Sequence, residues 1–233
     1  MLFKTVYQKK FVKFLVLLSL SIFFFSNFYI IDYSLPFFAN NDEGAFAIGS
    51  LSFLTLITGI KFNLLDPIIA PLLNIIIILI ITFINDFIIA SHSLFEIKDK
   101  FYLNPEIITY YGRISSLFIT TTAFAILFLI FKKLKINFLI YFPFFISLTF
   151  SMFASDLAIR SGKNSYYLLF FLLQFYFFLK YFLKLDKMGI KSYFIFGILA
   201  SLAWGVNYWS AIVSIYGILI LHYYKYKFTN LKF

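Results

Sequence analysis

Cysteine is absent from this 233-residue sequence, which excludes disulfide bonds, thiolate nucleophiles and Cys-based zinc or iron–sulfur sites. Histidine is scarce, and with His92 and His222 alone a His-rich metal site is not expected. Charged residues make up 13% of the chain, about half the share of an average soluble domain, and 62% are hydrophobic. This balance excludes a cytosolic domain and a disordered chain. We therefore expect an all-α, polytopic integral membrane helical bundle.

The net charge of +10 does not indicate a nucleic-acid partner. Such a partner needs Lys and Arg clustered on a soluble face. Here the basic residues lie between apolar runs, so membrane topology explains the charge better.

Apolar runs long enough to cross about 30 Å of hydrocarbon recur along the chain. We predict crossings at about 14–31, 107–131, 136–153 and 166–182, followed by a hairpin of two shorter runs, 193–204 and 209–221. Pro143 predicts a kink in the third crossing, which neighbouring helices tolerate. Residues 1–233 would then form a single transmembrane domain.

A loop over 32–106 follows the first crossing and holds two further apolar runs, 45–60 and 68–90. The second is long enough to span, although Asp86 lies inside it, and the first is short. Both can cross as a pair, or both can lie along the interface. We slightly favour interfacial or shallow helices.

The distribution of charge predicts the orientation. With the N-terminus in the cytoplasm, the inner segments carry fourteen basic residues and one acid, Asp186, whereas the outer segments carry six basic residues and nine acids. Enrichment of Lys and Arg in cytoplasmic loops sets the topology of membrane proteins. We therefore predict that the segments 32–106 and 154–164 lie outside.

An adjacent acid pair, Asp42-Glu43, follows the first crossing. Such a pair can supply a general base, with a partner that tunes its pKa or holds a divalent cation. Alternatively it is an ordinary solvated pair, with Asp42 or Asn41 capping the next helix. Spacing alone favours this second interpretation, because adjacent acids are common in loops.

Three outer cations, Arg113, Arg160 and Lys163, are candidate phosphate ligands. A guanidinium binds a phosphate through paired hydrogen bonds. The alternative is anchoring at the membrane interface, which Tyr110 and Tyr111 indicate for Arg113. Each position taken alone favours this alternative. The turn at Arg160 also lacks the glycine spacing of a nucleotide-binding loop.

Taken together, the segments resemble the membrane glycosyltransferases of the GT-C class, in particular protein-mannosyltransferase and aminoarabinose-transferase-like enzymes that use polyprenyl-phosphate sugars. Order and topology agree over nearly the whole chain, although each motif is short. The first matching features are the acid pair Asp42-Glu43 and the proline-containing stretch Asp66-Pro67 to Pro71. The next is the arginine of Tyr111-Gly112-Arg113, which opens a long helix that ends at Lys132-Lys133. The last are the acid–arginine turn with Asp156 and Arg160, the Tyr-Leu-rich helix start Tyr166-Tyr167-Leu168, and the glycine-bearing hairpin Gly197 to Ala203.

The resemblance implies transfer of a hexose or pentose, with inversion, from a polyprenyl phosphate to a hydroxyl of a lipid or glycan at the outer face of the inner or plasma membrane. Asp42 would deprotonate the acceptor hydroxyl, and Glu43 would assist or bind a divalent metal ion. Arg113, Arg160 and Lys163 would stabilise the departing phosphate. The implied partners are the lipid-linked sugar and membrane lipid, and no nucleic acid.

The chain departs from the family in two respects. Family members usually carry a lysine shortly after the glycine-bearing segment, where this chain has Val206-Asn207. They also continue with more helices and often a soluble domain. We therefore expect an N-terminal fragment or a reduced relative, completed by a C-terminal half or a partner subunit.

Two other functions stay open on the sequence. The chain can be a small membrane transporter or a lipid-carrier flippase component, because the break at Gly205 is typical of discontinuous helices that form midplane sites. It can also be an assembly subunit without chemistry of its own. Convergence of Asp42 with Arg113 and Arg160 in one outward cavity would favour the transferase.

Overall fold

The computed structural model describes residues 2–32, 69–91, 93, 96, 103, 106–160, 162–183, 189–206 and 208–230. Every regular element in these residues is a helix: α1 (Leu2–Tyr29), α3 (Ile69–Thr82), the π-helix η1 (Phe83–Ile89), α5 (Glu106–Lys133), α6 (Phe138–Thr149), α7 (Met152–Ile159), α8 (Lys163–Phe182), α9 (Ile190–Trp204) and α10 (Tyr208–Asn230). Four helical stretches are long and apolar enough to cross a membrane, and the bent pair α6–α7 gives a fifth if it is one span. The predicted all-α membrane helical bundle is confirmed.

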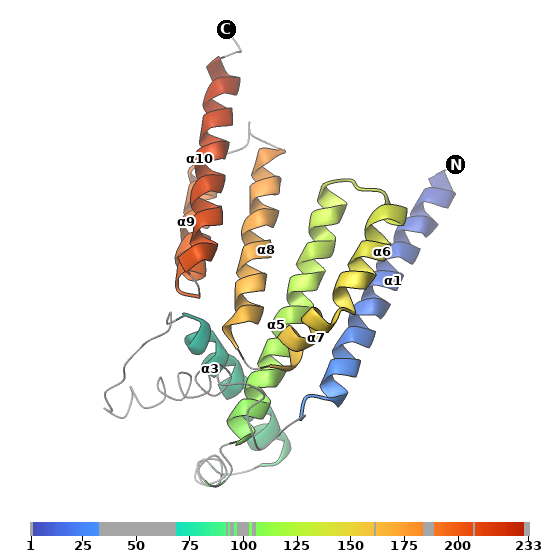
Figure 1. Ribbon diagram of the computed structural model, residues 1–233, viewed down its shortest axis with the longest axis vertical. Coiled ribbons are helices and arrows are strands. Elements are labelled where there is room, and N and C mark those ends of the chain that lie inside the picture. Colours follow the sequence, from blue (N-terminus) through green and yellow to red (C-terminus); the bar gives the residue numbers. More distant parts are fainter. Residues whose placement is uncertain are drawn as a thin grey trace.

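The long helices lie side by side, and the start of α1 and the end of α10 lie at the same end of the bundle (Figure 1). We call the opposite end the Arg113 end; it is where α1 ends and where α5 and α8 begin. The end where α1 starts is the lysine end. Helices α3 and η1 lie at the Arg113 end, with α3 against α5 and α8 (Figure 1).

Helix α5 lies at the centre and packs against α1, α3, α7 and α8. Phe23 of α1 meets Phe124 of α5 edge to face, with ring centroids 5.4 Å apart, and both are buried. The outward faces are apolar too, since Leu139 and Met152 expose 78% and 91% of their surface. Such faces are suited to hydrocarbon rather than to water.

The predicted crossing at 136–153 forms two helices rather than one kinked helix. Pro143 lies inside α6, and the chain bends by 52° between α6 and α7. Ser151 begins α7, where its side chain accepts a hydrogen bond from the backbone N–H of Ala154 at 3.1 Å. The bend is therefore placed by a new helix start rather than by the proline. Residues 154–159, expected in a turn, form most of α7.

The run 68–90 forms α3 and η1 in succession, and its stretch Leu72–Ile89 has the length and apolar character of a span. Even so, the two helices lie at the Arg113 end and do not extend along the length of the bundle (Figure 1). The run 45–60 lies outside the described residues. The interfacial or shallow placement of both runs stays a prediction.

Charge is segregated between the two ends of the described structure. The described acids lie just past α1, in η1, between η1 and the start of α5, and in α7, the helix before α8: Asp32, Asp86, Glu96, Glu106 and Asp156. Lysines dominate the lysine end, where α1 begins, α5 and α8 finish, and α9 starts: Lys10, Lys13, Lys132, Lys133, Lys135, Lys180 and Lys191. Lys225 and Lys227 lie in the last turns of α10, towards the same end. The pattern from which the orientation is predicted is therefore present in three dimensions.

Candidate functional site

The predicted catalytic pair, Asp42 and Glu43, lies outside the described residues, and its role stays a prediction. The nearest described residues before it in the chain are Ile31 and Asp32, just past the end of α1. The residues around the end of α1 are therefore the part of the candidate site that the structure describes.

Arg113 lies in the second turn of α5, where it is 1% exposed. Its Nη1 donates a hydrogen bond to the backbone carbonyl of Ile31 at 3.0 Å, across 82 residues of sequence. This carbonyl belongs to the turn that follows α1, whose last residue is Tyr29. A cation near the carboxyl end of a helix is favourable. Arg113 thus ties the turn after α1 to α5. Its predicted contact with a substrate phosphate stays a prediction.

A second buried contact ties η1 to the same part of α5. Asp86 is 1% exposed, and the hydroxyl of Tyr111 donates to its Oδ2 at 3.0 Å. The same hydroxyl accepts a hydrogen bond from Nδ2 of Asn85 at 3.1 Å. A carboxylate out of contact with water needs such donors. Asp86, an isolated acid within an apolar run, is therefore part of an interhelical polar contact.

A third polar contact joins α3, α5 and α8. Tyr166, fully buried in the first turn of α8, donates to Oδ1 of Asn74 at 3.2 Å and lies 2.6 Å from the hydroxyl of Ser115. Since Tyr166 uses its proton on Asn74, Ser115 is the donor to Tyr166. All three residues are buried, so the contact fixes α3 against the start of α8.

The other two predicted cations are more accessible than Arg113. Arg160 ends α7 and forms an ion pair with Asp156, four residues earlier, with both side chains about 40% exposed. Lys163 begins α8 and is partly exposed. Two residues later, the hydroxyl of Ser165 donates to the hydroxyl of Ser116 at 3.4 Å. Ser116 follows Arg113 by three residues on α5. The three cations are therefore at the same end of the bundle, but Arg113 is buried against α1 whereas Arg160 is paired locally.

Within the described ranges, no three His, Asp or Glu side chains are grouped as ligands of one metal ion. His222 lies towards the lysine end, where its Nδ1 is 2.9 Å from the hydroxyl of Tyr193. His92 lies outside the described residues.

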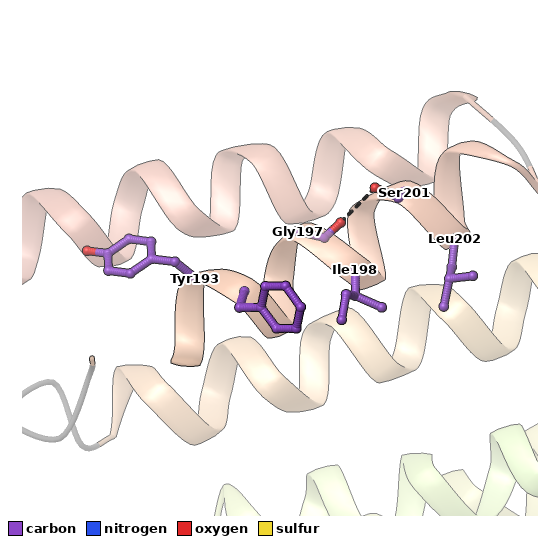
Figure 2. Close-up of a pocket in the computed structure, with 6 residues that line it drawn as sticks. Tyr193, Gly197, Ile198, Ser201 and Leu202 are labelled. Carbon is purple, nitrogen blue, oxygen red and sulfur yellow. Dashed lines mark hydrogen bonds between the residues drawn. The ribbon is translucent and has the colours of Figure 1, made fainter. Parts of the chain in front are cut away.

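A shallow apolar groove runs along the exposed face of α9 (Figure 2). Its lining residues are Tyr193, Phe194, Gly197, Ile198, Ser201 and Leu202. A Cβ added at Gly197 would meet no atom within 4 Å, so the glycine leaves open space. Leu202, at one end, packs against the cluster around Tyr166, which consists of the buried residues Ala70, Tyr166, Phe170, Ala203 and Val206. Lys163 lies one turn before Tyr166 on α8. The groove offers a surface for hydrocarbon but no acid or base for catalysis.

Sequence reasoning missed most of the buried polar contacts. Ser214 of α10 donates to Oε1 of Gln174 at 2.8 Å between two fully buried side chains, and Nε2 of Gln174 has no hydrogen-bond partner among the described residues. Asn74 likewise lies inside an apolar run. An isolated amide within a predicted span was the available signal, because polar groups in a membrane face the protein interior.

Comparison of the chain with protein-family models, with curated proteins and with solved structures found no match. The resemblance to GT-C enzymes therefore depends on the quoted residues and their order along the chain.

Proposed function

We propose that this chain transfers a hexose or pentose from a polyprenyl-phosphate donor to an acceptor hydroxyl, at the Arg113 end of a bundle in the inner or plasma membrane. The segregation of charge carries the proposal: the described acids and the candidate phosphate ligands are at the end where the chain leaves α1 towards Asp42. The lysines at the other end support a cytoplasmic position for that end and for the N-terminus.

In the proposed reaction the carboxylate of Asp42 removes the proton of the acceptor hydroxyl. The acceptor oxygen forms a bond to the anomeric carbon of the sugar, on the face opposite the leaving group. The bond from the anomeric carbon to the phosphate oxygen breaks, and its electron pair leaves with the polyprenyl phosphate. Glu43 assists Asp42 or binds a divalent metal ion. The product therefore has the inverted configuration.

Arg160 and Lys163 are the described cations best placed for the departing phosphate, because both are partly exposed. Preorganised positive charge at a leaving group stabilises the transition state. Leu202 of the α9 groove packs against the cluster around Tyr166, one turn along α8 from Lys163. This supports a donor whose phosphate lies near Lys163 while its prenyl chain follows the groove (Figure 2).

The proposal is tested with the full chain in proteoliposomes that contain polyprenyl phosphates carrying a radiolabelled hexose or pentose. We expect Asp42→Asn to lower transfer by about 100-fold or more, the usual contribution of a general base. Lys225→Gln, at the lysine end, is the matched control and should transfer normally. Transfer at the wild-type rate by Asp42→Asn would exclude Asp42 as the base.

The alternative is a small transporter or flippase component without covalent chemistry. It is favoured by the buried pair of Gln174 and Ser214 between α8 and α10, since polar groups inside a membrane often mark pathways. The same vesicles distinguish the two functions. A transporter would move the labelled lipid between leaflets and leave its sugar attached, whereas a transferase would release unglycosylated polyprenyl phosphate.

A further inference from the structure

We infer that Arg113 is a positioning residue that fixes the end of α1 to α5, and that Tyr111 independently fixes η1 to the same stretch of α5 through Asp86. The two residues are separated by one position, and each reaches a different neighbour. The first turns of α5 would then be the frame on which two other elements of the Arg113 end are placed.

The contact of Arg113 has the properties of a structural interaction. The guanidinium is 1% exposed and donates to a main-chain carbonyl, which is present whatever substrate is bound. Ile31 is also 2% exposed, so both partners are shielded from water. A buried charge is expensive unless hydrogen-bonded, and therefore tends to hold its partner in place.

The contact of Tyr111 is separate because it involves another element and other atoms. Tyr111 is 3% exposed and bridges Asn85 and Asp86 of η1 through one hydroxyl. π-helical turns widen the backbone at single positions and occur often at functional sites. Here the π-helix carries the two residues that meet the hydroxyl of Tyr111.

The positions of α1 and η1 do not depend on any assumed reaction, but the catalytic consequence rests on the proposed function. The chain continues from Ile31 towards Asp42, eleven residues later. Fixing Ile31 therefore restricts where that segment starts. Arg113 would act on catalysis through the end of α1, instead of through contact with the phosphate.

The test uses pairs of spin labels, which the absence of native cysteine makes simple. Leu139 on α6, 78% exposed, is the reference position. Tyr29, at 87% exposure, reports on the end of α1, and Ile89, at 71%, reports on the end of η1. The distances from Leu139→Cys to Tyr29→Cys and to Ile89→Cys are measured by pulsed electron resonance in the full chain in liposomes.

We expect Arg113→Gln to replace the single narrow distance to Tyr29 by a broad distribution while the distance to Ile89 stays narrow. Tyr111→Phe should broaden the distribution of distances to Ile89 and leave the distance to Tyr29 narrow. In Arg113→Lys the distribution of distances to Tyr29 should be narrower than in Arg113→Gln, because an ammonium still donates to a carbonyl. Arg160→Gln, which removes an exposed ion pair at the same end, is the control and should leave both distances unchanged.

Narrow distances in both Arg113→Gln and Tyr111→Phe would overturn the inference, and so would broadening of both distances by either variant. If Arg113→Gln does not accumulate, Tyr111→Phe decides the matter: a distance to Ile89→Cys that stays narrow, or a broadened distance to Tyr29→Cys, would overturn the inference. In the transfer assay a positioning Arg113 lowers kcat with little change in the KM for the donor, whereas a phosphate ligand raises that KM. The distance measurements stand even if no sugar transfer is detected, so the two proposals fail separately.

Discussion

Removing one hydroxyl, with Tyr166→Phe, tests whether the contact between α3, α5 and α8 stabilises the fold. The ring of Tyr166 is fully buried and keeps its packing in the variant, so the change isolates the hydrogen bonds to Asn74 and Ser115. Hydrogen bonds between membrane helices contribute about 0.6 kcal/mol on average, and two of them give about 1 kcal/mol. Ser115 can recover part of this loss by bonding to its own helix. We therefore expect a loss of about 1 kcal/mol in the free energy of unfolding.

Tyr167→Phe is the matched control, because it makes the same substitution at the next residue. The hydroxyl of Tyr167 makes no hydrogen bond to the described part of the chain, and its ring contacts Phe171. Unfolding by SDS in mixed micelles, followed by circular dichroism, measures both variants. Equal unfolding free energies for Tyr166→Phe and Tyr167→Phe would refute the proposed contribution of the buried contact.

Three further predictions use the same unfolding measurement. Gln174→Leu should change the free energy of unfolding by less than about 1 kcal/mol, because removal of a buried amide nitrogen without a partner among the described residues offsets loss of the hydrogen bond from Ser214; a larger loss would contradict this. Phe23→Ala should lower the free energy of unfolding by about 3 kcal/mol, because it leaves a cavity beside Phe124. Phe25→Ala, at a 68% exposed site, should lower it far less. Similar losses in the two variants would count against the assigned core. Gly197→Leu should be tolerated, because a Cβ there meets open space. Gly217→Leu should destabilise the protein, because a Cβ there lies 3.3 Å from the ring of Phe178. A larger loss of stability in Gly197→Leu than in Gly217→Leu would be incompatible with the packing of α8 on α10.

The spans were predictable because long apolar runs with basic ends have few alternatives in a membrane. The crossing predicted at 107–131 is part of α5, Glu106–Lys133, and the one at 166–182 is part of α8, Lys163–Phe182. The break at Ser151 was not predictable from hydrophobicity, because both sides of it are apolar. A local capping preference decided it instead of Pro143.

The candidate site was less predictable, because burial depends on contacts that are distant in sequence. Arg113 was expected either to bind a phosphate or to anchor its helix at the membrane interface. The carbonyl of Ile31, which accepts a hydrogen bond from Arg113 in the structure, is 82 residues away. Tyr166 and Asn74 are 92 residues apart, so no local spacing connects them. Isolated polar residues in apolar runs indicate that a partner exists, but the identity of the partner follows only from the fold.

The most direct test of the account asks which end of the bundle faces the cytoplasm. Ser93 is exposed between η1 and α5 at the Arg113 end, and Gly189 is exposed just before α9 at the lysine end. A Cβ at Gly189 meets no atom within 4 Å, so a cysteine fits there. We predict that a membrane-impermeant maleimide labels Ser93→Cys in intact cells and labels Gly189→Cys only after the membrane is permeabilised. Labelling of Gly189→Cys in intact cells, with Ser93→Cys protected, would contradict the orientation and the proposed transferase with it.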